Sequence, residues 1–151
     1  LSNYSHIKNK QSMAREIRYS FFREISRKEN INTLYLGHHK DDFIETAIMQ
    51  EARSENLPFY GIDKDSKYFD LTVIRPMLKM YKEIIVSKLI KRNIPFMNDL
   101  SNLELKFERN KIRFNLSQKN KKTKNKIYKH YTMINKSRQT LRINTNKKWN
   151  E

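Results

Sequence analysis

The chain has 151 residues, enough for one domain with a modest hydrophobic core. It contains no cysteine, which excludes a disulfide-stapled fold and a cysteine-bound metal cluster. Its formal net charge of +16 indicates a polyanionic partner, with nucleic acid favoured over an anionic membrane surface. Since no apolar run approaches the roughly 20 residues that a membrane helix needs, we expect a soluble cytoplasmic protein without a membrane partner.

The positive charge is concentrated in the last third of the chain. From Glu104 to the end there are 15 Lys and Arg residues and 3 Asp and Glu residues, a net charge of +12, which leaves +4 for residues 1–103. We therefore predict a near-balanced domain over residues 1–100. Residues 101–151 are predicted to be a basic segment, helical or disordered, that contacts nucleic acid.

Hydrophobic periodicity predicts helices and strands that alternate along the chain. Apolar residues at spacings of three and four predict helices, and short apolar runs between turn residues predict strands. This alternation favours an α/β fold with a parallel sheet that is covered by helices on both faces. In chain order the elements are a helix over 12–29, a strand over 33–37, a helix over 41–53, a strand over 70–76, a helix over 79–92 and a strand over 94–99.

Two details of this pattern bear on the structure. In the first helix, the spacing predicts one buried stripe formed by Ala14, Ile17, Phe21 and Ile25. Past residue 99 the pattern weakens to one helix, with Ser101 or Asn102 as its N-cap. The remainder, residues 117–151, is rich in Lys and Asn and is predicted to be disordered or a loose basic helix.

The segment GHHKDDFIETAIM at 37–49 gathers titratable groups directly after a predicted strand. Ligands in open α/β sheets bind beyond the carboxyl ends of the strands, and a helix that starts near His38 would place His38, Asp42 and Glu45 on one face. Three interpretations stay open at this point: acids that complement a helix dipole, a histidine-carboxylate site for zinc or iron, and a nucleotide site. The helix dipole accounts for Asp41 and Asp42 but not for the histidines.

Five motifs in the same order carry a resemblance to a known family. They are AREIRYSFF at 14–22, GHHKDDFIET at 37–46, Arg53, IRPML at 74–78 and NIPFMNDLSNLELKFERNKIR at 93–113. The second resembles the GHHxDDxxET signature of the tRNA(Ile)-lysidine synthetases, which are N-type PP-loop ATPases, and the others resemble further motifs of that family. The resemblance covers about residues 12–114.

The resemblance implies a Rossmann-like sheet, ATP and Mg²⁺ as cofactors, and isoleucine tRNA with a CAU anticodon and free lysine as partners. In this family ATP adenylates the C2 position of the wobble cytidine, and the ε-amine of lysine then displaces AMP. Oligomeric state stays open, with a homodimer as one option. By motif position the resemblance assigns catalysis to Arg18, His38, His39, Asp42 and Glu45, and substrate binding to Asp42, Glu45 and Arg53.

Physical chemistry suggests roles for these groups. Arg18 and a histidine are expected to neutralise phosphate charge, and Asp42 and Glu45 to hold the lysine ammonium and take its proton. A second group of cations is expected either to contact tRNA or to form a solvated basic surface. That group consists of Arg75, Arg109, Arg113, Lys121, Lys122 and Lys124.

Two departures from the family pattern set further expectations. The phosphate-binding loop of the family, S-G-G-x-D-S, does not occur in the sequence, so we expect the later part of a synthetase, with weak ATP binding and an exposed sheet edge. Ser54, Glu55 and Asn56 replace a Gly-Ser-Gly segment, and the loss of two glycines restricts the loop that follows Arg53. The alternative to an enzyme is a non-catalytic RNA-binding relic of this family.

Overall fold

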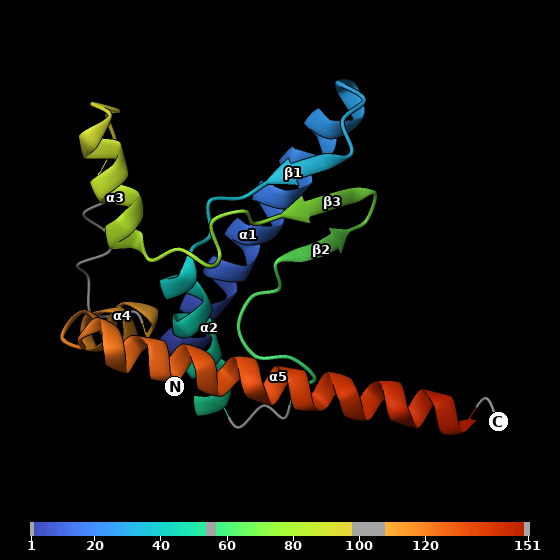
Figure 1. The fold of residues 1–151 in the computed structure, drawn as a ribbon. Coiled ribbons are helices and arrows are strands. Elements are labelled where there is room, and N and C mark those ends of the chain that lie inside the picture. The colour runs from blue at the N-terminus through green and yellow to red at the C-terminus, as the bar shows by residue number, and fades with distance from the viewer. Residues whose placement is uncertain (1, 54–56, 98–107, 150–151) are drawn as a thin grey trace. The chain divides into compact units, whose positions relative to one another are not determined.

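The structure is a computed structural model that describes residues 2–53, 57–97 and 108–149 (Figure 1). The chain forms two compact units, one made of Leu1–Leu36 and Lys64–Pro76 and the other of Gly37–Asp63 and Met77–Glu151. Among the described helices, none has the length and apolar character needed to cross a membrane. The elements are α1 (Ser2–Lys28), β1 (Thr33–Tyr35), α2 (Lys40–Ala52), β2 (Asp65–Tyr68), β3 (Leu71–Ile74), α3 (Lys82–Lys91), α4 (Glu108–Ser117) and α5 (Lys121–Trp149).

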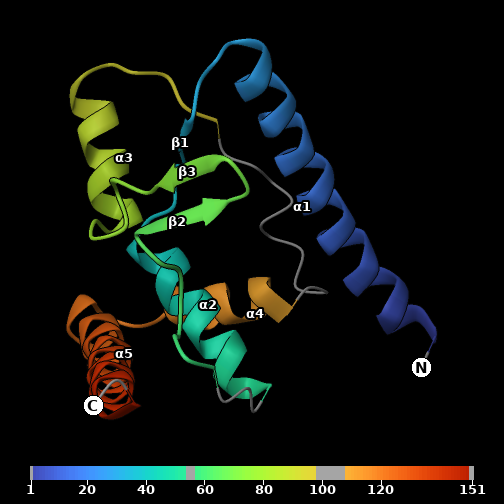
Figure 2. The same ribbon diagram turned by 90° about the vertical axis from the view of Figure 1, so that its right-hand side faces the viewer.

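The first unit is a small sheet with α1 packed beside it (Figure 2). The strand order is β1-β3-β2, in which β1 pairs with β3 in parallel and β2 pairs with β3 antiparallel. Val73 lies at the centre of the sheet, opposite Leu34 on one side and Ser66 on the other. The predicted α/β class is confirmed, with a sheet that is mixed rather than wholly parallel.

Helix α1 meets the sheet through a different face from the predicted one. Tyr19 is 5% exposed and its ring lies 4.6 Å from that of Tyr68, while Arg23 pairs with Asp70 at the β2-β3 turn. The predicted inward stripe is wrong, because Phe21 is 56% exposed and the others of the stripe are exposed as well. Aromatic and charged contacts with the hairpin, rather than aliphatic burial, therefore orient this helix.

Two predicted strand assignments also need correction. Residues 65–68, where the sequence pattern predicts no strand, form β2, because their backbone pairs with β3 even though their side chains are mostly polar. Residues 94–97 do not form the expected third strand, and Phe96 and Met97 are 40% and 95% exposed, so they lack the burial that a central strand has. The last two residues of that expected strand, and the expected N-cap Ser101 or Asn102, lie outside the described residues.

The second unit packs α2 against α4 and α5. In Figure 2, α5 is seen nearly end-on with α2 and α4 beside it. Burial of apolar and aromatic side chains is the main source of stability in such a core. The core residues are Phe43, Ile44, Ala47, Tyr60, Leu78, Tyr81, Leu116 and Tyr131.

Of the two alternatives predicted for residues 117–151, disorder or a loose basic helix, the structure has a helix, α5, which packs into this unit. The ring of Tyr128 contacts that of Phe43 at 5.1 Å, and the Tyr131 hydroxyl donates to Glu51 at 2.5 Å. Asn135 is 8% exposed and makes two hydrogen bonds with the backbone of Tyr60, at 2.7 and 2.8 Å. Aromatic and amide groups thus anchor a helix that has few aliphatic residues. The functional division into residues 1–100 and 101–151 stays a prediction.

Candidate functional site

The histidine-aspartate segment forms the first turn of α2. His39 is the N-cap residue in extended backbone, with Asp42 three positions later. The Asp42 N–H donates to His39 Nδ1 at 3.4 Å, and the His39 N–H donates to Asp42 Oδ2 at 2.9 Å. This reciprocal capping box satisfies two backbone donors and fixes the turn. The expected helix start is confirmed. It places the side chains of Asp41 and Asp42 in the first turn of α2.

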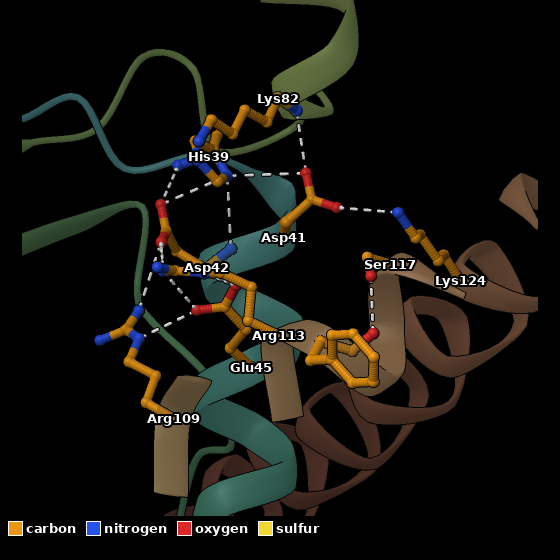
Figure 3. A network of polar contacts seen from close by, with 10 residues as sticks. His39, Asp41, Asp42, Glu45, Lys82, Arg109, Arg113, Ser117 and Lys124 are labelled. Atoms are coloured by element: carbon orange, nitrogen blue, oxygen red, sulfur yellow. Dashed lines mark hydrogen bonds and ion pairs between the residues drawn. The ribbon is translucent and has the colours of Figure 1, made fainter. Parts of the chain in front are cut away.

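Behind this turn, Glu45 is almost completely buried, with a side chain that is 2% exposed. Its Oε2 accepts from Arg109 Nε at 2.9 Å, and both its oxygens accept from Arg113, Oε1 from Nε and Oε2 from Nη2, each at 2.9 Å. Asp42 Oδ1 lies 3.3 Å from Arg109 Nη2 and 3.9 Å from Arg113 Nη2. Figure 3 shows these four side chains converging from α2 and α4. We call them the arginine-carboxylate network.

The network balances two negative and two positive charges. An unpaired carboxylate at the position of Glu45 would be strongly unfavourable, and the hydrogen bonds from the guanidinium groups offset that cost. The hydrogen bonds from Arg113 to Glu45, opposed by burial, raise the pKa of Arg113. The arginine side chains remain 38% and 32% exposed, so both are partly accessible to solvent.

Next to the network lies a pocket of about 460 Å³, within the size range of small-molecule sites. Asp41 lines this pocket, where its Oδ2 accepts from the Lys82 N–H at 2.8 Å and its Oδ1 lies 3.7 Å from Lys124 Nζ. The walls combine both charges with a short apolar section, which suits a small zwitterion with an aliphatic part. The lining residues are His39, Asp41, Glu45, Lys82, Glu83, Val86, Arg113, Leu116, Ser117 and Lys124.

Lys40 connects the first turn of α2 with α5 and with the N-terminal end of α3. It is 9% exposed, its Nζ donates to Asn125 Oδ1 at 2.9 Å, and it lies 4.0 Å from the ring centroid of Tyr128 and 4.5 Å from that of Tyr81. Burial lowers the pKa of Lys40. Sequence reasoning missed this residue, although a lysine between the histidines and aspartates of one turn was a visible signal.

Some of the predicted site residues lie together around the start of α2, and others do not. Asp42, Glu45 and His39 lie together, and Arg109 and Arg113, expected as tRNA contacts, join them through the network. Lys124 faces the pocket, whereas Lys121 and Lys122 are exposed. His38 is half-buried.

The remaining predicted residues lie in other surroundings. Arg18 is exposed on α1 in the first unit, and Arg75 in that unit is 5% exposed with Nη1 donating to Ser66 at 3.0 Å. Arg53 caps the end of α2 and pairs with Glu108 at 3.3 Å. Ser54, Glu55 and Asn56 lie outside the described residues. Their predicted contacts with substrate or tRNA stay predictions.

Within the described ranges, no three His, Asp or Glu side chains gather as metal ligands. A magnesium ion would need carboxylate oxygens. Asp41, Asp42 and Glu45 all contact cationic side chains. These residues therefore do not fit a magnesium site.

Comparison with known proteins defines the class. A family profile described as a PP-loop domain matches residues 2–120, so the chain belongs to the PP-loop domain family. Within that class the chain is similar to tRNA(Ile)-lysidine synthases. It is 39% identical over 145 residues to the enzyme of Mesoplasma florum, which covers 95% of this chain and 36% of the relative. It is 42% identical over 110 residues to that of Ureaplasma parvum, covering 73% and 33%.

A third relative, the tRNA(Ile)-lysidine synthase of Mesomycoplasma hyopneumoniae, is 36% identical over 129 residues, covering 85% of this chain and 43% of the relative. The chain thus spans less than half of the length of each of these relatives, and only about a third of the Ureaplasma parvum enzyme. The family resemblance drawn from the five motifs is confirmed.

Proposed function

We propose that this chain carries the lysine-binding part of a tRNA(Ile)-lysidine synthase. Such an enzyme uses ATP to adenylate the wobble cytidine of isoleucine tRNA, and lysine then displaces AMP to form the new carbon-nitrogen bond. The observation that carries the proposal is the arginine-carboxylate network at the GHHKDDFIET turn, beside a pocket lined by both charges. Similarity to relatives of that name supports the choice of reaction.

The geometry favours different roles for the two carboxylates. Glu45 already accepts three hydrogen bonds at 2.9 Å, and it is buried, so it acts as the group that positions Arg109 and Arg113. Asp42 Oδ1 has only longer contacts, at 3.3 and 3.9 Å. A lysine ammonium would therefore pair with Asp42 at lower cost, and Asp42 would take the proton that the amine loses before it attacks C2.

The arginines serve the other half of the reaction. We expect the partly exposed Arg109 and Arg113 side chains to lie near the phosphate of the adenylated cytidine, where guanidinium groups stabilise developing negative charge. Bound ATP would supply the adenylyl group. Arg18 and the histidines stay proposed contributors, and Mg²⁺ stays a proposed cofactor away from these carboxylates. The cytoplasm, where ATP and tRNA are abundant, stays the expected compartment.

The test is ATP-dependent incorporation of labelled lysine into an isoleucine tRNA with a CAU anticodon, by the complete protein that carries this chain. We expect incorporation that depends on ATP and releases one AMP per lysine. A transcript with uridine at the wobble position is the matched control and should accept no lysine. Absence of incorporation, together with intact RNA binding, would instead favour the non-catalytic RNA-binding relic.

A further inference from the structure

Helix α5 presents two different faces. One face is buried in the second unit through Tyr128, Tyr131 and Asn135. The other face is exposed, and four of its side chains are lysines. We call Lys122, Lys126, Lys129 and Lys136 the lysine row.

The members of the lysine row share one side of the helix. Their spacings of four, three and seven residues keep them within about 80° of one another at 100° per residue. At about 1.5 Å per residue, the row is about 21 Å long. A straight line of positive charge of this length matches the repeating phosphates of a nucleic acid strand better than it matches a single small anion.

Helix α5 supplies no negative charge to the lysine row. Residues 109–150 contain no Asp or Glu, so the helix has no acidic side chain of its own. Within the part of the chain that the structure describes, no carboxylate forms an ion pair with any of the four lysines. An uncompensated row of this kind raises the local concentration of polyanions and speeds their association.

The same face does not suit a membrane surface. A helix that lies on a membrane buries a broad apolar face among the lipids. On α5 the apolar and aromatic side chains Tyr128 and Tyr131 face the interior of the unit instead. Among the lysines the exposed face offers one large apolar side chain, Met133, which is 71% exposed.

From these observations we infer that the lysine row is a docking surface for the phosphate backbone of RNA. Naming tRNA as that RNA rests on the proposed function. Lys124, on the opposite side of α5, lies 3.7 Å from Asp41 at the pocket. One helix therefore carries both a pocket contact and the RNA surface, which keeps the docked strand at a fixed distance from the site.

The experiment replaces three charges of the row and measures RNA binding. In the complete protein, Lys122→Gln, Lys126→Gln and Lys129→Gln are combined, and binding to isoleucine tRNA is followed by fluorescence anisotropy at several salt concentrations. We expect the dissociation constant to rise at least about tenfold at low salt. The slope of log affinity against log salt should fall by up to about 2–3, since each of the three lost phosphate contacts removes about 0.7–0.9.

The matched control removes the same number of positive charges from a different part of the second unit, in and just before α3. It combines Lys79→Gln, Lys88→Gln and Lys91→Gln, all exposed, and we expect affinity within twofold of the unmodified protein. Equal losses in both triple variants would show an effect of net charge alone and overturn the proposal. Unchanged tRNA affinity in the row variant, or loss of binding to phosphatidylserine vesicles without loss of tRNA binding, would overturn it as well.

This result is separable from that of the proposed function. If the unmodified protein does not incorporate lysine, the catalytic proposal fails, yet a weakened row variant would still establish the RNA surface. If lysine incorporation occurs and the row variant binds tRNA normally, only the docking surface fails. Because the three side chains are exposed, the melting temperature should be the same in both triple variants.

Discussion

Replacing Glu45 by Gln is expected to lower the free energy of unfolding by about 2 kcal/mol and to reduce lysine incorporation at least about 100-fold. The substitution keeps the shape of the side chain but removes its negative charge. The Glu45 carboxylate accepts three hydrogen bonds at 2.9 Å from Arg109 and Arg113. Breaking a fully buried pair typically costs about 3–5 kcal/mol. The loss expected for Glu45→Gln lies below this range because about a third of each arginine side chain is exposed. Urea unfolding followed by circular dichroism measures the stability term.

Two further variants show whether the network is the cause. Glu24→Gln changes the same residue type at an exposed position of α1 and should alter stability by less than about 0.5 kcal/mol. In a double-mutant cycle, Glu45→Gln in an Arg113→Met background should cost less than it does alone, because its main partner is already gone. Strict additivity of the two costs would contradict the proposed coupling.

Replacing Gly61 by Ala is expected to destabilise the protein by about 2–4 kcal/mol. The backbone of Gly61 has a φ of +85°, which residues with a side chain rarely adopt. An added Cβ would lie 2.5 Å from Cε2 of Phe43, a ring that is 3% exposed in the core. Backbone strain and overpacking therefore act together at this position. Thermal unfolding of the variant should show a clear fall in Tm.

The other glycine of the chain provides the control. At Gly37 an added Cβ would meet only Met77 Cε at 3.6 Å, an ordinary contact, and the backbone does not require glycine. Gly37→Ala should therefore change the free energy of unfolding by less than about 0.5 kcal/mol. Similar losses at both glycines would mean that the positive φ and the Phe43 contact are not the cause.

The local part of the site could be predicted from the sequence. The strand before Gly37, the helix start at the histidines and the common face of Asp42 and Glu45 all follow from short-range periodicity and capping. The resemblance of five motifs identified the family, since their order is far more specific than any one of them.

The long-range part could not be predicted in the same way. Arg109 and Arg113 lie 64 and 68 residues from Glu45, and a helical spacing of four does not reveal which carboxylate they meet. Their i, i+4 arrangement matches the i, i+3 spacing of Asp42 and Glu45, which was the available signal.

The same limit explains the errors in the fold. An apolar stripe predicts that a helix has a buried face, but Tyr19 and its contact with Tyr68, set by the hairpin, decided which face of α1 it is. Strand β2 has the polar sequence DSKY and gains its structure from pairing with β3. Helix α5 has few aliphatic residues, and it is anchored by Tyr131 and Asn135 through partners more than 70 residues away.

The most direct test of the account is lysine incorporation by the complete protein with Asp42→Asn, measured beside its affinity for isoleucine tRNA. The substitution keeps an oxygen to accept the His39 N–H and removes the charge proposed to receive the lysine ammonium. The account predicts that incorporation falls at least about 100-fold while tRNA affinity stays within twofold. Unchanged incorporation, or equal loss of incorporation and tRNA affinity, would contradict a chemical role for this carboxylate.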